Sequence, residues 1–196
     1  MKKFLVFILS LGLIACFSIN GCRTAPDVVR VKMDYTPTNT VLPPKTLPDT
    51  PIYIGPFEDN RKTPDQIGQN SEKAKIVPAK VEPGEVIPFM EKAFRQEFKR
   101  VGLNPVDSKG QAKRILQLTI NSFWVEEKDI YESSLVAQIS VFDPSGKKLY
   151  SDNFRGVAKR WGSSYDPDNY RKVLSDTVVE LLKKVLDNDA FMKSLA

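Results

Sequence analysis

The chain has 196 residues, of which 41% are hydrophobic and 27% are charged, and its net charge is +5. These proportions are ordinary for a globular protein, and the positive charge is too mild and too dispersed to predict nucleic-acid binding. Histidine is absent, which removes the commonest general base, the commonest metal ligand and every Ser-His or Cys-His nucleophile. We therefore expect no enzyme activity, no metal site and no cofactor.

The first 22 residues predict export and a lipid anchor. A short positive segment, Met1 to Lys3, precedes an uncharged apolar run over 4–14, which is the layout of a secretory signal peptide. The run is too short for a membrane-spanning helix, which needs about 20 apolar residues. The stretch from Ile19 to Cys22 resembles a bacterial lipobox, with a small residue directly before the cysteine. We predict a lipoprotein signal peptide over 1–21 and lipidation of Cys22.

Alternatives to lipidation at Cys22 remain open. Cys16 also ends a lipobox-like stretch, and by residue type that stretch fits better. Cys22 is favoured because apolar residues continue past Cys16, whereas the sequence after Cys22 is polar. A disulfide between the two cysteines, or cleavage without lipid, are the other possibilities. The resemblance to lipoproteins implies a stable two-signal acyl anchor. Because Arg23 replaces the aspartate of inner-membrane retention, it also implies the cell outer membrane, with the domain facing the periplasm.

Residues 22–50 combine the predicted lipidated cysteine with a proline-rich linker. Proline removes backbone donors and fixes φ, so we expect no regular core element here. A flexible coil of about 28 residues would average roughly 30 Å, and a polyproline II segment would reach about 85 Å. We expect this linker to hold the domain away from the lipid surface. Alternatively, Val28, Val29 and Val31 pair with a sheet edge, so that part of the linker docks.

Residues 51–196 predict a single α+β domain, in which an antiparallel β-meander in a mixed sheet is packed by two amphipathic helices. The first strand covers 51–56 and is followed by a long polar loop over 62–82, with a short strand at Ile76–Val77. The next helix begins after Pro83-Gly84-Glu85 and ends before Gly102, which has the features of a C-terminal cap. Its apolar stripe has helical spacing and consists of Ile87, Met90, Phe94, Phe98 and Val101.

Three strands and a second helix complete the predicted domain. After a short extended piece at 103–106, alternating apolar residues predict strands over 112–125, 131–142 and 147–158. Asp166 followed by Pro167 is typical of a helix N-cap and its first position. The last long helix runs from there to about residue 188, and we expect its charged residues, Asp176 among them, to face solvent. Two amphipathic helices need a partner surface, which the apolar face of the meander supplies.

The order of these features resembles the YajG-like family of bacterial lipoproteins. The features are the lipobox, the proline-rich tail, a strand followed by Asp59-x-Arg61 and Ile67-Gly68, a helix closing on Val101-Gly102-Leu103, the meander, and a terminal helix closing with Phe191. The resemblance implies an outer-membrane lipoprotein of unknown molecular function. It supplies no catalytic residues.

Two loops contain the candidate binding residues. Asp59 and Arg61 either present a polar site or form a charge pair that pins the loop after the first strand. Arg160, Trp161 and Tyr165 either offer an interface, where aromatic residues and arginine are enriched, or seal the meander against the last helix. If both loops come to the same end of the sheet, they form one patch for partner binding. That patch consists of Phe57, Asp59, Arg61, Arg160, Trp161 and Tyr165.

Other polar clusters offer weaker signals for a site. Glu126, Glu127 and Asp129 could serve a Ca²⁺ ion or a glycosidase, but at a hairpin tip such acids are usually solvated charges, and glycosidases need opposed carboxylates in a cleft. Ser163 and Ser164 have no base partner. The glycines form no phosphate-binding pattern.

The sequence favours a non-enzymatic, lipid-anchored cell-envelope lipoprotein. We expect it to be an accessory, assembly or binding factor whose partner is an envelope protein or cell-wall material. The alternative is an auxiliary lipoprotein subunit of an envelope lipid-transport system of the ABC type, which rests on analogy of fold. A cell-wall hydrolase that uses carboxylates is a third possibility.

Overall fold

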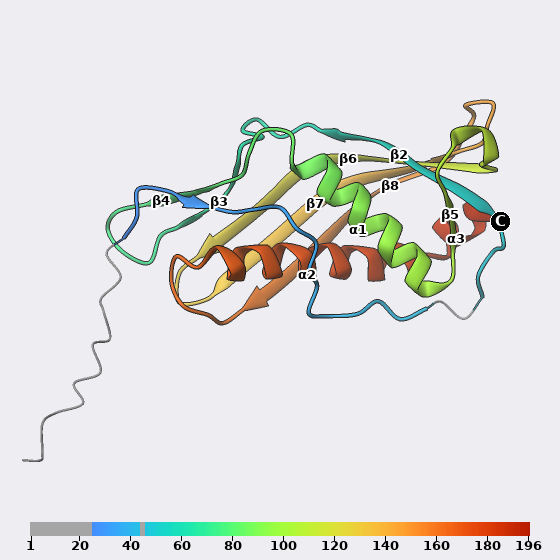
Figure 1. The fold of residues 1–196 in the computed structure, drawn as a ribbon. Coiled ribbons are helices and arrows are strands. Elements are labelled where there is room, and N and C mark those ends of the chain that lie inside the picture. Colours follow the sequence, from blue (N-terminus) through green and yellow to red (C-terminus); the bar gives the residue numbers. More distant parts are fainter. Residues whose placement is uncertain (1–24, 44–45) are drawn as a thin grey trace, which may run out of the picture.

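The computed structural model describes residues 25–43 and 46–196, so the predicted signal peptide and the lipidation of Cys22 lie outside the described residues. The described chain forms one mixed sheet of eight strands, with three α-helices (Figure 1). The predicted α+β class is confirmed. The strands are β1 (Val29–Arg30), β2 (Pro51–Asp59), β3 (Gln66–Asn70), β4 (Val77–Lys80), β5 (Asn104–Val106), β6 (Arg114–Glu127), β7 (Tyr131–Phe142) and β8 (Lys148–Arg160).

The three long strands β6, β7 and β8 form the predicted antiparallel meander. Alternate residues of β7 are buried, among them Leu135, Ala137 and Ile139, because successive side chains of a strand point to opposite faces. The turn from Asp143 to Lys147 joins β7 to β8, and the Asp143 carboxylate accepts hydrogen bonds from the backbone of Ser145 and Lys147. β2 and β3 then add to this meander along the free edge of β6.

Strand β6 is the centre of the sheet because two strands pair in succession with its free edge. β2 runs parallel to its first half, from Arg114 to Ile120, and β3 runs parallel to its end, from Val125 to Glu127. β3 was not predicted from the sequence, because a long polar loop was expected over 62–82. It is polar apart from Ile67, and Gly68 lies so close to β6 that an added Cβ would be 2.3 Å from the Val125 carbonyl oxygen. β4 then returns antiparallel to β3 and β1 pairs parallel with β4.

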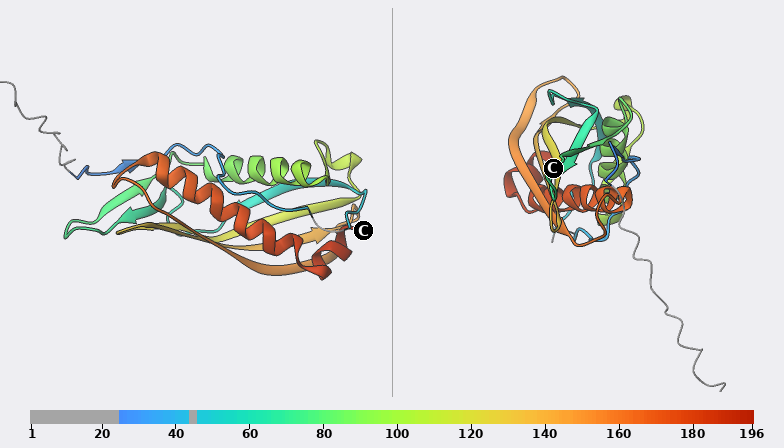
Figure 2. Two further views of the ribbon diagram at one scale, coloured as in Figure 1. Left: turned by 90° about the horizontal axis from the view of Figure 1, so that it is seen from below. Right: turned by 90° about the vertical axis from the view of Figure 1, so that its left-hand side faces the viewer.

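Both long helices pack on the same face of the sheet. The helices are α1 (Val86–Val101), α2 (Pro167–Leu186) and the short α3 (Asp189–Leu195). Asp166 caps α2 through its carboxylate, which accepts from the Asp168 amide, and Pro167 occupies the first helical turn as predicted. Gly102 ends α1 with φ of 91°, a left-handed conformation that favours glycine. The sheet bends around the helices, so that β8 lies beside α2 (Figure 2).

Residues 25–43 form a strap that crosses the helical layer (Figure 1). Val29, Val31, Tyr35 and Val41 are buried in the common core, and the strap contributes β1 to the sheet. The alternative prediction, in which valines of this region pair with a sheet edge and part of the linker docks, is the one that the structure shows. Val29 and Val31 alternate with exposed residues, so their side chains can be buried while the backbone pairs with β4. The prolines lie outside β1 and do not interrupt this pairing.

Hydrogen bonds hold the strap on both helices. The Tyr35 hydroxyl donates to Glu97 of α1 at 2.9 Å, and the Thr36 amide donates to the Ser175 hydroxyl of α2 at 3.0 Å. The Asp176 carboxylate of α2 accepts from the Thr38 amide at 2.6 Å and from the Asn39 amide at 3.0 Å. Asp176 is 4% exposed, which corrects the expectation that it faces solvent.

Candidate functional site

Arg61 fills the junction between β2 and β3 on the edge of β6. Its guanidinium makes an ion pair of 2.7 Å with Asp59, and the two side chains are 6% and 14% exposed. It also donates to the carbonyl oxygens of Pro64, Gln66 and Phe123. β2 pairs as far as Ile120 and β3 pairs from Val125, so Arg61 satisfies a backbone carbonyl that would otherwise lie unpaired in the gap between the two strands.

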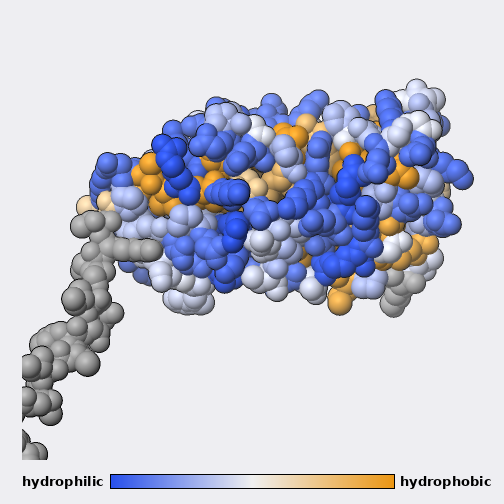
Figure 3. Space-filling model, in the orientation of Figure 1, coloured by the Kyte–Doolittle hydropathy of each residue, from blue (hydrophilic) through white to orange (hydrophobic). Residues whose placement is uncertain are grey.

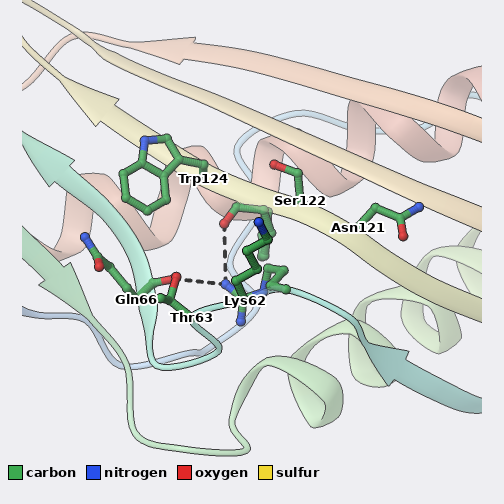
Figure 4. A pocket seen from close by; sticks show the side chains of 8 residues that line it. Lys62, Thr63, Gln66, Asn121, Ser122 and Trp124 are labelled. Atoms are coloured by element: carbon green, nitrogen blue, oxygen red, sulfur yellow. Dashed lines mark hydrogen bonds between the residues drawn. The ribbon is translucent and has the colours of Figure 1, made fainter.

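A small cavity of about 170 Å³ lies beside this junction. Figure 4 shows Lys62, Thr63, Gln66 and Trp124 around it, with Asn121 and Ser122 along β6. Pockets for small molecules usually measure about 300–1,000 Å³ and are mostly apolar. The cavity is smaller than this range, and its lining mixes polar side chains with Phe123 and Trp124. Asp59 and Arg61 form the charge pair that pins the loop after β2.

Phe57 is part of the core rather than of a surface. Its ring is 6% exposed and contacts Phe94 of α1 edge to face, with 5.2 Å between the ring centroids. It pairs with Leu118 in the interior of the sheet. Phe57 therefore helps to seat α1 on β2, and truncating it would affect stability.

The loop that follows β8 divides into a buried part and an exposed part. Tyr165 is 6% exposed whereas Trp161 is 77% exposed. Tyr165 has φ of 59°, an uncommon and strained conformation for a bulky residue. Its amide donates to Glu127 at 2.8 Å, a bond that holds the backbone in this conformation. Tyr165 seals the sheet against α2, and Trp161 extends into solvent.

Glu127, at the end of β6, holds the loop after β8 in place through hydrogen bonds. It is 1% exposed and accepts from the Tyr170 hydroxyl at 2.7 Å as well as from the Tyr165 amide. Burial and this carboxylate raise the pKa of the Tyr170 phenol. The expectation of a solvated acid was wrong for Glu127, because the loop after β8 folds over the end of β6. The alternation of β6 could have revealed this, since Glu127 continues the buried register of Phe123 and Val125.

Neighbouring bonds make the exposed part of the loop rigid. The Tyr131 hydroxyl donates to the Ser163 carbonyl at 2.5 Å and accepts from the Asp166 amide at 3.2 Å. Arg160 donates to Asn169 at 3.2 Å. Gly162 packs so tightly that an added Cβ would lie 2.1 Å from Asn169. Trp161 therefore projects from a preorganised backbone.

The two predicted binding loops do not meet. Asp59 pairs with Ile120 of β6, whereas Arg160 pairs with Tyr131, which faces Glu127. The separation of seven positions along β6 corresponds to roughly 24 Å. Of the six residues of the predicted patch, only Trp161 is exposed; Asp59, Arg61 and Arg160 are half-buried, and Phe57 and Tyr165 are buried.

The loop after β8 instead contacts the β3–β4 hairpin and, through it, the start of the strap. The Ser164 hydroxyl donates to Glu72 at 2.5 Å, and Lys75 forms an ion pair of 2.7 Å with Asp27. We call this end of the molecule the proximal end. It comprises residues 25–28, the hairpin turn 71–76, the turn 128–130 and the loop 161–166. It exposes Ile76 (59%) as well as Trp161.

A second cavity, of about 340 Å³, lies where the strap passes the start of α1. Met33, Pro88 and Phe89 give it an apolar lining, and Glu85 and Lys92 add charge. The Met33 amide donates to Glu85 at 3.4 Å. Sequence analysis missed this site, because it arises from the docking of the strap. Within the described residues, no group of three or more acids or cysteines is placed to hold a metal ion.

Comparison with known proteins supports the fold alone. No protein-family model and no curated protein matches the chain. A Xanthomonas campestris protein of the DUF330 family is 11% identical to the chain, covers 85% of it and 94% of its own length, and has a TM-score of 0.55. The chain thus shares its fold with a bacterial protein of that family.

Two further solved structures resemble the chain more weakly. The PelC dodecamer of Paraburkholderia phytofirmans is 14% identical, with coverage of 78% of this chain and 94% of that one and a TM-score of 0.44. Lipoprotein B of Nitrosomonas europaea is 13% identical, with coverage of 71% and 83% and a TM-score of 0.37. At these scores, neither carries an argument about this chain.

Proposed function

We propose that the protein is a non-enzymatic lipoprotein of the bacterial outer membrane, anchored through Cys22, that serves as an accessory, assembly or binding factor for an envelope protein or for cell-wall material. The observation that carries the proposal is the position of Ala25, which packs against the core only three residues after Cys22. An acyl anchor at Cys22 therefore holds a folded domain directly at a membrane. None of the helices in the described part of the chain is both long and apolar enough to span a bilayer.

The buried charged side chains bond to parts of the fold itself, which supports a binding role over catalysis. Arg61 and Asp59 serve the sheet junction, Glu127 serves the loop after β8, and Asp176 holds the strap. A catalytic acid or base needs access to a substrate as well as a tuned pKa. The motif order that resembles the YajG-like lipoproteins agrees with the proposal.

The anchor is tested by labelling cells with a fatty-acid probe. The wild type is expected to take up the label and to sediment with the outer membrane, whereas Cys22→Ser is expected to take up none. The matched control, Cys16→Ser, should label as the wild type does. Label retained by Cys22→Ser and lost by Cys16→Ser would show that Cys16 is the anchor.

An auxiliary role in envelope lipid transport is the second candidate, and the apolar cavity beside Met33 and Phe89 favours it. Such a cavity could take part of an acyl chain, with Lys92 near a phosphate. Co-purification with a transport ATPase, together with loss of fluorescent-lipid binding in Phe89→Trp, would support this role. Failure of the purified protein to bind phospholipid would remove it.

A further inference from the structure

We propose that the proximal end of the domain lies on the membrane surface, with Trp161 and Ile76 inserted among the lipid headgroups. The inference rests on the proposed anchor at Cys22. It concerns the contact that the folded domain itself makes with the bilayer, and it replaces the expectation that a free linker holds the domain away from lipid.

The length of chain between anchor and domain forces this contact. Ala25 is the third residue after Cys22, and a fully extended chain spans at most about 3.6 Å per residue. Ala25 therefore lies within about 11 Å of the lipidated cysteine. From Val29 onward the strap is fixed in the sheet and core, so no further length can be released without breaking β1.

The topology brings the exposed apolar residues to the same end. β3 and β6 both run toward the proximal end, and β8 also ends there, opposite the start of β7. The ion pair between Lys75 and Asp27 joins the hairpin of Ile76 to the strap, and the bond from Ser164 to Glu72 joins it to the loop of Trp161. Apolar residues show at the surface near this end, as they do elsewhere along the face drawn in Figure 3, so the assignment rests on the exposure of Ile76 and Trp161.

The chemistry of these side chains fits a headgroup layer. Tryptophan combines a large apolar ring with one polar N–H, and it is enriched at membrane–water interfaces. The rigid loop presents Trp161 without the ordering cost that a mobile loop would have. Lysine stems can lie along apolar surface while the ammonium group stays in water, and Lys73, Lys75 and Lys128 are exposed around the same end.

The net charge of the proximal end is small, which limits the electrostatic contribution. Besides these lysines, it carries Asp27, Glu72, Asp129 and Asp166. Polybasic segments bind anionic lipid through an excess of positive charge, which this end lacks. We therefore expect contact with neutral phosphatidylcholine vesicles to be nearly as complete as with vesicles that contain phosphatidylglycerol.

Tryptophan fluorescence of the full lipidated protein in vesicles tests the proposal. The chain has two tryptophans, so Trp124→Phe leaves Trp161 as the reporter and Trp161→Phe leaves Trp124. Brominated phosphatidylcholine should quench most of the Trp161 emission and shift it to the blue, while Trp124, which is half-buried on β6 beside the cavity at the β2–β3 junction, should keep most of its emission. Unquenched Trp161 in a protein that carries its fatty acid would overturn the proposal, whereas absence of the fatty acid would overturn the anchor instead.

A second measurement does not depend on tryptophan substitution. Ile76→Cys and Ser145→Cys each introduce one accessible thiol for a polarity-sensitive dye, at the proximal end and in the β7–β8 turn at the opposite end of the meander. The dye at position 76 should shift to the blue on vesicles, and the dye at 145 should not. Equal behaviour of the two dyes would contradict the proposal. Because the vesicles contain no other protein, shielding that occurs only in native membranes would instead assign Trp161 to a protein partner.

Discussion

At the scale of single residues, buried polar groups decide how the proximal end is built. Glu127 has two donors in contact, the Tyr165 amide and the Tyr170 hydroxyl. Hydrogen bonds to a charged group contribute about 1.5–3 kcal/mol each, and a buried donor left without an acceptor costs about 1–3 kcal/mol. The same carboxylate holds the strained backbone of Tyr165, so it links the end of β6 to the position of Trp161.

Glu127→Ala is expected to lower the free energy of unfolding by about 3 kcal/mol, because two buried donors lose their acceptor. Urea titration followed by circular dichroism measures the change. Asp129→Ala is the matched control in the same turn, where the side chain is exposed, and it should change stability by less than about 0.5 kcal/mol. Equal effects of the two substitutions would mean that Glu127 is solvated.

Alkaline pH is expected to unfold the protein through its buried tyrosines. Burial raises the pKa of Tyr35, Tyr131 and Tyr170 above the ordinary value of 10.0. A raised pKa in the folded state gives stability that is fully present below pH 10.0 and is lost as the pH rises above it, because the unfolded chain then releases protons that the folded chain keeps.

Phenolate absorbance during a pH titration checks this expectation. The buried tyrosines should ionise together with unfolding, after the half-buried ones. Tyr170→Phe should remove one phenol from the delayed group. If every tyrosine ionises in one step near pH 10.0 while the circular dichroism spectrum stays native, the phenols are not buried.

At the scale of elements, the parts with strong local patterns could be predicted from the sequence. β7 lies where alternation predicted it, and Gly102 and Asp166 end and begin helices as expected. β3 could not be predicted, because its pairing depends on a glycine that fits against the Val125 backbone rather than on apolar alternation. The strap could not be assigned either, because its partners are Glu97, Ser175 and Asp176, far away in the sequence.

The candidate site could be predicted only in part, because the burial of its residues also depends on partners that are far away in the sequence. Trp161 and Tyr165 belong to one short loop with similar composition, and only the tertiary partner Glu127 decides which of them is buried. The sequence identified the loop as an aromatic cluster, but the exposure of each ring depends on how the loop folds over β6. Likewise, the place of the Asp59–Arg61 pair depends on the gap between β2 and β3.

Asp176→Ala is expected to loosen the strap without unfolding the sheet. The amides of Thr38 and Asn39 lose their acceptor, so their hydrogen exchange should become faster, and stability should fall by about 2 kcal/mol. Mass spectrometry of strap peptides measures the exchange. Glu180→Ala removes a carboxylate one turn later on α2, where it pairs with Lys183, and should leave strap exchange unchanged. Unaltered exchange in Asp176→Ala would show that these bonds do not hold the strap.

Gly156→Ala is expected to separate α2 from β8. The added Cβ would lie 2.2 Å from the Thr177 carbonyl oxygen and 2.8 Å from the Leu181 amide nitrogen, both in the backbone of α2. Overpacking of this kind costs about 1–3 kcal/mol, so thermal unfolding should shift downward by several degrees. Gly110→Ala is the control, since its nearest neighbour would be 3.7 Å away. Comparable melting of the two variants would contradict the close packing of α2 on β8.

At the scale of the whole molecule, the strap converts a linker into part of the domain. β6 has 14 residues and is therefore about 45 Å long, and the chain enters the fold at one end of this long axis (Figure 1). If Cys22 carries the proposed anchor, the proximal end would face the bilayer, and the β7–β8 turn and α3 would lie at the far end of the domain. Partners would then meet the distal end or the flanks of the domain.

Neutron reflectometry of the lipidated protein on a supported bilayer tests this arrangement most directly, because it measures where protein density begins above the headgroups. The account predicts protein density that starts within the headgroup layer. The height of that density reports the tilt of β6, because an upright strand of this length would extend about 45 Å and a tilted one less. A solvent layer of about 30 Å between headgroups and protein, as a free coil of the linker's length would give, would contradict it.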